Sequence, residues 1–260
     1  MLECRLNYLD RYVDRFVIVE SDRTFSGIKK DLNFELHKSR YERYLHKIIY
    51  LPYISDGIKF STNWHFEFSQ RDYISKALEQ FSSDDIVFVS DVDEIPNPQI
   101  FQDVQTFLHQ GDSLVARLNQ TVLLYNLKTK QENGWMRCYA SKVKTVIEQT
   151  PSWLRSRDEQ RVLHYFSIRP EKEYPQIQTR YFQNAGWHLC YFMDVDHVVK
   201  KIESFSHNEL NTPFFKDKER IQKCISERID MYERPILSTT IDPSVEFTQE
   251  FLSAFGRWIA

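Results

Sequence analysis

Three carboxylates within four positions indicate a cation-binding site in the stretch DDIVFVSDVDEIPNP. Asp91, Asp93 and Glu94 repel one another at neutral pH, and the prolines that follow prevent a helix from spreading the charges apart. An Asp-x-Asp pair at the end of a strand suits a hard divalent cation, whose remaining positions substrate phosphates fill. The alternative is an acidic turn in which Asp93 or Asn97 caps the next helix.

The apolar periodicity around this stretch predicts an α/β fold. We expect strands at 13–21, 46–53, 84–91 and 187–193, a long strand or hairpin at 113–127, a turn or helix at 151–161, and helices at 2–9, 64–81, 100–109, 194–206, 214–232 and 245–260. This alternation predicts a mostly parallel sheet with helices on both faces. Asp91 to Glu94 then lie beyond the carboxyl end of a central strand, where open α/β sheets bind ligands.

Composition limits the classes of protein that the chain can represent. The 260 residues, 42% of them apolar, fit a single domain, and the net charge of −3 argues against nucleic acid or an anionic membrane as the main partner. No apolar run reaches the length of a membrane span. The four cysteines lack metal-site spacing, so we expect buried, reduced thiols in a cytoplasmic protein.

Two classes of enzyme place Asp-x-Asp after such a strand. Phosphatases of the haloacid-dehalogenase type need Thr or Val two residues after the second aspartate, where this chain has Ile95, and they also need a later aspartate pair. Glycosyltransferases of the GT-A type use the pair to hold a metal on the donor diphosphate, and this class fits better. A glycan- or nucleotide-binding relic of the same fold stays open as an alternative without turnover.

Four segments resemble glycosyltransferase family 17 in the right order: LECRLNYLDRYVDRFVIVESDRTFSG, SDVDEIPNP, NAGWHLCYF and KIESFSHNELN. The resemblance runs from Leu2 to about Asp230. It implies a GT-A-like fold and inverting transfer of N-acetylglucosamine from a UDP-sugar, with Mn²⁺ or Mg²⁺. It also implies a first strand before Leu2, which the chain as given lacks. The chain as given also has no Golgi anchor, so we expect a cytoplasmic location in a microbe or virus, and a glycan or other hydroxyl acceptor in place of a bisected N-glycan.

The first half of the chain, 1–127, is expected to bind the nucleotide and the metal. Asp93 holds the cation, Asp91 binds the cation or the ribose, and Arg71 adds a cationic contact; a solvated or paired arginine is the alternative for Arg71. The end of the first strand is where a nucleoside should lie, although the same residues suit an ordinary turn. These residues are Glu20, Ser21 and Thr24.

The second half, 128–260, is expected to bind the acceptor side. Trp187 and His188 follow a glycine, and a tryptophan face is a good platform for a sugar ring, although a core tryptophan looks the same in sequence. His207 is a candidate third metal ligand, or a histidine that merely interacts with the end of a helix.

The acceptor hydroxyl needs a base, and carboxylates are the candidates. Asp196 and Glu209 are the first choices, and Glu94 beside the metal is the next. Asp194 is a weaker choice, because its place at a helix start suits an N-cap. The sequence does not distinguish between Asp196 and Glu209.

Overall fold

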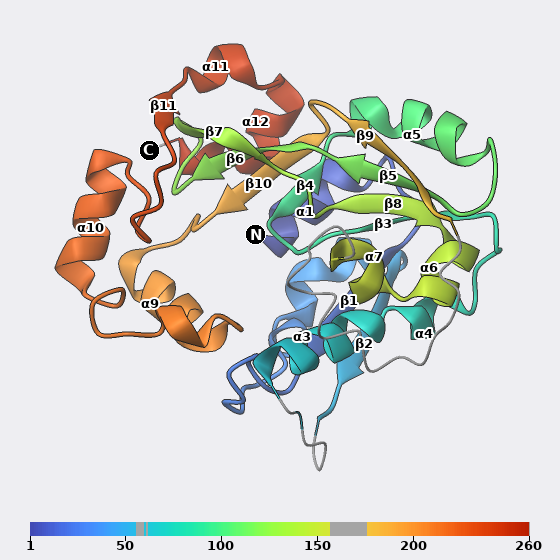
Figure 1. The fold of residues 1–260 in the computed structure, drawn as a ribbon, viewed down its shortest axis with the longest axis horizontal. Coiled ribbons are helices and arrows are strands. Elements are labelled where there is room, and N and C mark those ends of the chain that lie inside the picture. Colours follow the sequence, from blue (N-terminus) through green and yellow to red (C-terminus); the bar gives the residue numbers. More distant parts are fainter. Residues whose placement is uncertain (56–59, 61, 157–175, 260) are drawn as a thin grey trace.

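The computed structural model describes residues 1–55, 60, 62–156 and 176–259, and all that follows concerns these residues (Figure 1). The part of the predicted turn or helix at 151–161 that follows residue 156 therefore lies outside them.

The helices are α1 (Leu2–Leu9), α2 (Asn33–Leu36), α3 (Asn63–Asp72), α4 (Ser75–Leu78), α5 (Phe101–Leu108), α6 (Val143–Gln149), α7 (Pro151–Ser156), α9 (Val195–Ser204), α10 (Lys218–Glu227), α11 (Pro243–Glu246) and α12 (Gln249–Phe255). The strands are β1 (Phe16–Ser21), β2 (Ile48–Tyr53), β3 (Ile86–Val89), β4 (Glu94–Pro96), β5 (Leu114–Leu118), β6 (Gln120–Leu124), β7 (Thr129–Trp135), β8 (Tyr139–Lys142), β9 (Gln178–Phe182), β10 (Gly186–Cys190) and β11 (Ser238–Thr240).

These strands form three sheets, with orders β1-β2, β3-β8-β5-β9 and β11-β7-β6-β10-β4. Of the pairings between strands in the described residues, three are parallel and five antiparallel. The predicted α/β class is confirmed, but the pairing is mixed and not mostly parallel. The physical reason is that short connections, such as the one from β6 to β7, can join only antiparallel neighbours.

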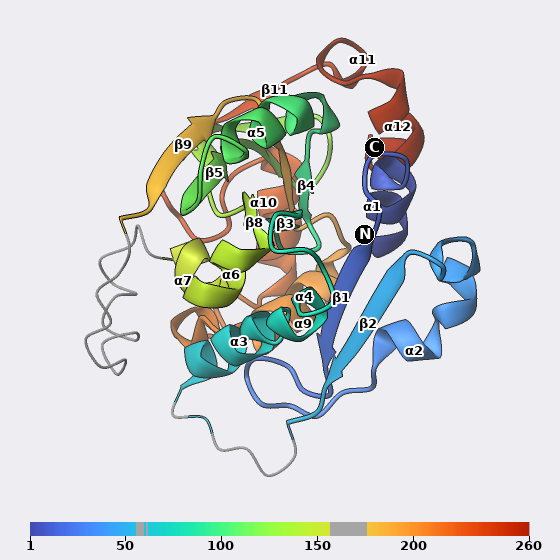
Figure 2. The same ribbon diagram turned by 90° about the vertical axis from the view of Figure 1, so that its right-hand side faces the viewer.

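Helices cover both faces of the four-stranded sheet, as predicted (Figure 2). On one face, Val104, Phe107 and Leu108 of α5 pack against β5, β8 and β9. On the other face, α4, α6 and α7 pack through buried residues such as Leu78 and Leu154. The sheet therefore has an apolar core above and below it.

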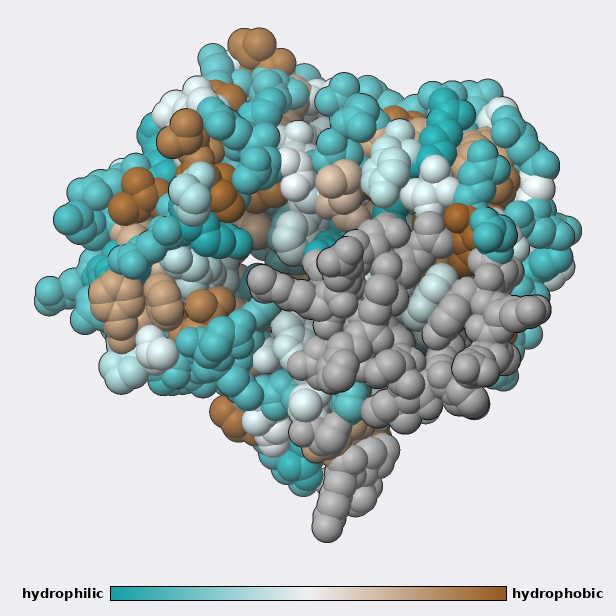
Figure 3. Space-filling model, in the orientation of Figure 1, coloured by the Kyte–Doolittle hydropathy of each residue, from teal (hydrophilic) through white to brown (hydrophobic). Residues whose placement is uncertain are grey.

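The five-stranded sheet has its own partners at the two ends of the chain. Leu6 of α1 and Phe251 and Phe255 of α12 pack against Leu123 and Leu189 of β6 and β10. Helices α9 and α10 pack over the ends of the same two strands (Figure 1). The face drawn in Figure 3 is mostly hydrophilic, with hydrophobic residues gathered mainly on the side that carries α9, α10 and β11.

Three predicted elements are divided in the structure. The helix expected at 245–260 is interrupted at Phe247, which is extended, between α11 and α12. The helix expected at 64–81 is broken between α3 and α4, where the N–H of Ile74 donates to the carbonyl of Arg71 in a tighter turn. The stretch 113–127 forms β5 and β6, which belong to different sheets. Both larger sheets take strands from each side of residue 127, so the proposed halves 1–127 and 128–260 share their cores.

Candidate active site

The three clustered carboxylates lie where the chain leaves one sheet and enters another. β3 ends at Val89 in the four-stranded sheet, and β4 begins at Glu94 in the five-stranded sheet. The link closes with a turn in which the N–H of Glu94 donates to the carbonyl of Asp91 (3.0 Å). The register of β4 depends on Gly186, whose φ is +138° and where a Cβ would lie 2.2 Å from the carbonyl oxygen of Ile95.

Arg5 of α1 binds the backbone of this link. Its guanidinium donates to the carbonyls of Glu94 (2.5 Å) and Asp91 (3.2 Å), and to the hydroxyl of Ser90 (2.7 Å). Because these acceptors are carbonyl and hydroxyl oxygens, Arg5 leaves the carboxylates free for other partners.

Two arginines donate hydrogen bonds to the carboxylate of Asp91. Arg71 of α3 donates to its Oδ1 (3.1 Å), and Arg155 of α7 donates to its Oδ2 (2.7 Å). Burial opposes ionisation, but the two guanidinium groups outweigh it and hold the pKa of Asp91 far below its usual value. Both oxygens of Asp91 are therefore engaged. Arg71 is a paired arginine, as in the alternative stated for it, and its contact with a nucleotide stays a prediction.

Asp93 is less fully engaged. Lys201 of α9 donates to its Oδ2 (3.1 Å), while the Nε2 of His188 lies 3.9 Å from Oδ1, beyond hydrogen-bonding distance. Burial opposes ionisation here too, yet Lys201 and His188 lower the pKa of Asp93. Among the residues that the structure describes, Asp93 is thus an ionised carboxylate with one oxygen open to a further ligand.

Glu94 is fully buried. Arg155 donates to both of its oxygens (2.8 and 2.7 Å), the N–H of Asp91 donates to Oε2 (2.9 Å), and the indole N–H of Trp135 donates to Oε1. A carboxylate with four donors and no exposed surface cannot reach an acceptor hydroxyl in this structure. Its contacts are those of a residue that positions Asp91 and Arg155.

His188 and Trp187 lie on opposite faces of β10, because side chains alternate along a strand. His188 is beside Asp93; burial lowers its pKa, but Cys190, Asp93 and Glu94 outweigh this and raise it to about 9. Trp187 packs instead on Phe251, with ring centroids 4.3 Å apart, in the cluster between α1 and α12.

The indole beside the carboxylates is Trp135, which sequence reasoning missed. It is half-buried, and its ring centroid lies 4.6 Å from that of His188. The signal that could have found it is the pair Gly134-Trp135, which repeats the pair Gly186-Trp187. Arg155 and Lys201 were also missed, because nothing in the sequence distinguishes them among the 34 lysines and arginines.

The nucleoside candidates at the end of β1 mainly build turns. The carboxylate of Glu20 accepts from Lys30 (2.8 Å) and from the N–H groups of Asn33 (2.7 Å) and Phe34 (2.8 Å). Ser21 is buried and accepts from the N–H of Arg23, and Thr24 accepts from the N–H of Ile28. These contacts match the turn interpretation, and the binding of a nucleoside here stays a prediction.

The other three carboxylates considered as the catalytic base are exposed. Asp194 caps α9 by accepting from the N–H of His197 (2.9 Å), and Asp196 pairs with Lys218 (2.7 Å). Glu209 accepts from the Nδ1 of His207 (2.7 Å). None of these three carboxylates contacts Asp91 or Asp93 among the described residues.

His207 lies beside α3, with its ring 4.7 Å from that of Trp64. Within the ranges that the structure describes, no three His, Cys, Asp or Glu side chains are gathered closely enough to hold a metal ion, so Asp91, Asp93 and His207 do not form a ready-made triad. A chain of contacts still connects this segment to the cluster: Ser206 donates to Glu67 (2.6 Å), which accepts from Arg71.

A model of glycosyltransferase family 17 matches residues 1–236. The chain belongs to glycosyltransferase family 17. This family 17 chain is therefore a glycosyltransferase, as its sequence predicted. A search of curated proteins with this sequence found no match. In the part of the family 17 chain that the structure describes, no helix is both long and apolar enough to cross a membrane.

Proposed function

We propose that the protein transfers N-acetylglucosamine from UDP-N-acetylglucosamine to a hydroxyl of a glycan or similar acceptor, with inversion, at Asp91 and Asp93. The observation that carries this proposal is the pair of ionised aspartates at the change of sheet, within a chain of glycosyltransferase family 17. The pair lies beyond the end of β3, the place where α/β sheets bind ligands.

The residues fit a divalent cation that substrate completes. Asp93 has an oxygen to which no described residue donates a hydrogen bond, whereas both oxygens of Asp91 are bound by arginines. Mg²⁺ commonly binds through one or two carboxylates and takes its other ligands from phosphates and water. Asp93 would therefore hold Mn²⁺ or Mg²⁺, which neutralises charge on the diphosphate. We leave His207 out of this ligand set because Glu209 engages it.

Protein cations would complete the binding of the diphosphate. Lys201 Nζ lies at Asp93 and is partly exposed, so it can turn toward a phosphate oxygen without leaving the site. Arg71 and Arg155 keep Asp91 ionised and fixed in place. As the bond between the sugar and the diphosphate breaks, charge develops on the leaving phosphate, and fixed cations stabilise it.

The acceptor oxygen attacks the anomeric carbon while the bond to the diphosphate oxygen breaks, and a carboxylate takes the hydroxyl proton. We propose Glu209 as this base and Asp196 as the alternative. The reason is position: Glu209 lies in the segment that contacts α3 and is connected to Asp91 through Ser206, Glu67 and Arg71. Asp196 pairs with Lys218 of α10 instead.

Trp135 is the better candidate for the sugar platform. Its ring is beside His188 and partly exposed, whereas Trp187 packs into the cluster with α12. A flat indole next to Asp91 and Asp93, where the UDP-sugar would bind, suits the apolar face of a sugar ring.

Isothermal titration with UDP, with and without Mn²⁺, tests the donor site. We expect heat that depends on Mn²⁺ in the parent chain and is lost in Asp93→Asn. As a matched control, Asp112→Asn changes an exposed carboxylate that pairs with Lys142 and Lys144, and it should leave binding unchanged. Absence of heat under both conditions in the parent chain would contradict the proposal.

A further inference from the structure

β6 and β10 are each followed by a tyrosine whose backbone is left-handed. Tyr125 follows β6 with a φ of +67°, and Tyr191 follows β10 with a φ of +56°. A residue with a Cβ is strained in this conformation, and such strain is concentrated at functional sites. The two strands are parallel neighbours, and the N–H of Tyr125 donates to the carbonyl of Cys190 (2.8 Å). The two strained residues therefore lie at the same edge of the sheet.

Both tyrosines are buried and bound to the same segment of the chain. Their exposed fractions are 6% for Tyr125 and 8% for Tyr191. The hydroxyl of Tyr125 donates to the carbonyl of Ile229 (2.8 Å), and the hydroxyl of Tyr191 is hydrogen-bonded to that of Tyr232. The two residues thus match in backbone conformation, burial and the segment that their hydroxyls bind. A difference between them must come from the contacts of their rings.

Of these two rings, only that of Tyr191 has a cation over it in the described part of the chain. The Nζ of Lys201 lies 4.8 Å from the ring centroid, a distance at which the face of an aromatic ring attracts a cation. The same Nζ donates to Oδ2 of Asp93 (3.1 Å). The ring of Tyr191 and the carboxylate of Asp93 therefore bind one ammonium group at the proposed donor site.

A ring suits a cation that must change its hydrogen-bond partner. A lysine side chain has many rotamers, and ordering it on a ligand costs entropy. The face of a ring attracts an ammonium group without requiring a particular hydrogen-bond direction. When Lys201 turns from Asp93 to a phosphate oxygen, the ring of Tyr191 can therefore still restrain it.

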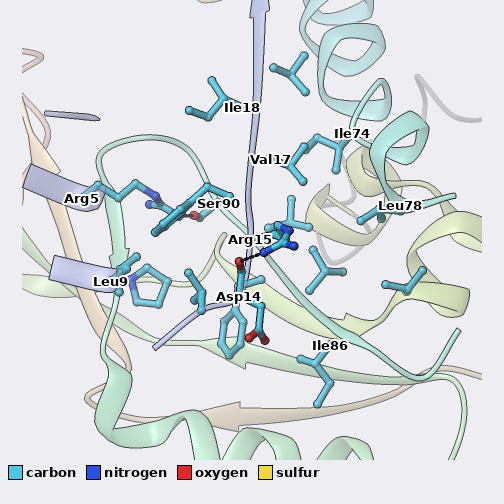
Figure 4. A pocket seen from close by; sticks show the side chains of 18 of the residues that line it. Arg5, Leu9, Asp14, Arg15, Val17, Ile18, Ile74, Leu78, Ile86 and Ser90 are labelled. Carbon is cyan, nitrogen blue, oxygen red and sulfur yellow. Dashed lines mark hydrogen bonds between the residues drawn. The ribbon is translucent and has the colours of Figure 1, made fainter. Parts of the chain in front are cut away.

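This contact is separate from the cavity that borders β3. The cavity, of about 1010 Å³, reaches Asp91 and Ser90, where Arg5 of α1 also lies (Figure 4). Neither Lys201 nor Tyr191 lines it. A substitution at Tyr191 therefore leaves the walls of this cavity unchanged.

We propose that Tyr191 positions Lys201 for the diphosphate of the donor, an inference that rests on the proposed function. The ring holds the ammonium group at Asp93 in the free protein and keeps it within reach of a phosphate oxygen when the donor binds. The hydroxyl binds Tyr232 and supports the fold. Tyr191 thus raises the affinity of the site for phosphate by acting through Lys201.

Leucine at position 191 tests the role of the ring. Tyr191→Leu keeps a Cβ, and with it the backbone strain, but removes the ring. With Mn²⁺ present, we expect about tenfold weaker binding of UDP by titration calorimetry, the effect of one cation–π contact. Affinity for uridine, which carries no phosphate, should be unchanged when followed by NMR shifts. Tyr191→Phe keeps the ring, so it should bind UDP within about threefold of the parent.

Tyr125→Leu is the matched control. It removes a tyrosine of the same backbone conformation and burial, which also binds the segment from Ile229 to Tyr232. It should lower the melting temperature as Tyr191→Leu does, but leave the affinity for UDP unchanged.

A double-mutant cycle with Lys201→Met shows whether Tyr191 acts through the lysine. In the Lys201→Met background, Tyr191→Leu should cause no further loss of UDP affinity. NMR of the parent chain with lysines labelled with ¹³C at Cε gives a readout that needs neither nucleotide nor a change at Tyr191. The ring should shift the ε protons of Lys201 upfield, and the signal that is missing in Lys201→Met assigns them.

The outcomes separate positioning from a structural role. Weaker binding of UDP in Tyr191→Leu alone, with no further loss beside Lys201→Met, supports the proposal. It is overturned by an equal loss in Tyr125→Leu, by equal losses for UDP and uridine, by additive losses in the cycle, or by an unshifted Lys201 signal. Absence of heat with UDP in the parent contradicts the proposed function as well, whereas equal heat in the parent and Tyr191→Leu overturns this inference alone.

Discussion

Arg155 and Glu94 form a buried bidentate ion pair, with the two guanidinium nitrogens 2.8 and 2.7 Å from the carboxylate oxygens. The same nitrogen that binds Glu94 Oε1 also binds Asp91 (2.7 Å). One arginine from α7 therefore fixes both the buried and the accessible carboxylate of the cluster.

Removal of one partner of this pair should be costly. Glu94→Gln leaves Arg155 without its buried countercharge, and breaking such a pair typically costs about 3–5 kcal/mol. We expect a clear loss of unfolding free energy by chemical denaturation. The control is Arg11→Lys in the exposed pair with Glu250, which should change stability by less than about 1 kcal/mol. Similar small effects for both variants would contradict the positioning role of Glu94.

Substitution of Trp187 should lower the stability of the fold, whereas substitution of Trp135 should weaken binding of the sugar. Trp187→Ala removes a ring from the cluster with Phe251, and such truncations cost about 3–5 kcal/mol, so the melting temperature should fall. Trp135→Phe loses the indole N–H that binds Glu94 but keeps an aromatic ring. Because the ring is the proposed platform, Trp135→Phe should bind the sugar better than Trp135→Ala does. Binding of UDP and of the UDP-sugar, measured by titration, provides the comparison. The assignment fails if Trp135→Ala affects UDP and the UDP-sugar equally.

Glu20 should stabilise the fold in a way that depends on pH. Burial would raise the pKa of Glu20, but Lys30 and the N–H groups of Phe34 and Asn33 outweigh it and lower the pKa below its ordinary value of 4.5. The stabilisation is therefore complete above pH 4.5 and is lost as pH falls through the lower pKa of the folded state.

Glu20→Gln should thus cost about 1–2 kcal/mol at neutral pH, as expected for hydrogen bonds to a charged group, and less in acid. Thermal unfolding of both chains across pH gives the difference. Glu35→Gln is the control, because its pair with Lys38 is exposed. A constant difference at all pH values would show that Glu20 does not act through its charge.

Removal of the catalytic base should lower the rate of transfer without changing the binding of UDP. Glu209→Gln should lower the rate of transfer by about 10²–10⁴-fold while the affinity for UDP and the dependence on Mn²⁺ stay unchanged. Asp196→Asn, at a carboxylate paired with Lys218, should remain near normal. The reverse pattern would assign the base to Asp196, and full rates in both variants would place it elsewhere.

The sequence predicted the elements with strong periodicity and the position of the carboxylates. The apolar runs of β1, β2 and β3 and the helical spacing of α1 and α5 depend on local pattern, and each is present. Asp91 and Asp93 follow the end of β3, as expected, but the prediction that this strand is central was wrong, because β3 lies at the edge of its sheet among the described strands. The contact of Arg71 with Asp91 was not predicted, because the sequence only suggested that this arginine contacts the donor.

Other features depend on contacts between distant residues. Arg155 lies 64 positions from Asp91 and Lys201 lies 108 from Asp93, and no local pattern encodes such pairs. The face of β10 that meets α12 decides the role of Trp187, and sequence alone does not show which face that is. The separation of β5 from β6 into two sheets likewise depends on the tertiary arrangement and not on the apolar run.

The release of UDP from UDP-N-acetylglucosamine in the presence of an acceptor array is the most direct test of the central claim. Chromatography of the products should show UDP and a glycosylated acceptor for the parent chain with Mn²⁺, and the NMR coupling of the anomeric proton should show inverted configuration. Asp93→Asn should give neither product although it remains folded, with a somewhat lower melting temperature because Lys201 loses its partner, and Asp112→Asn should match the parent. Undiminished turnover in Asp93→Asn, or no turnover of the parent with any UDP-sugar, would contradict the account.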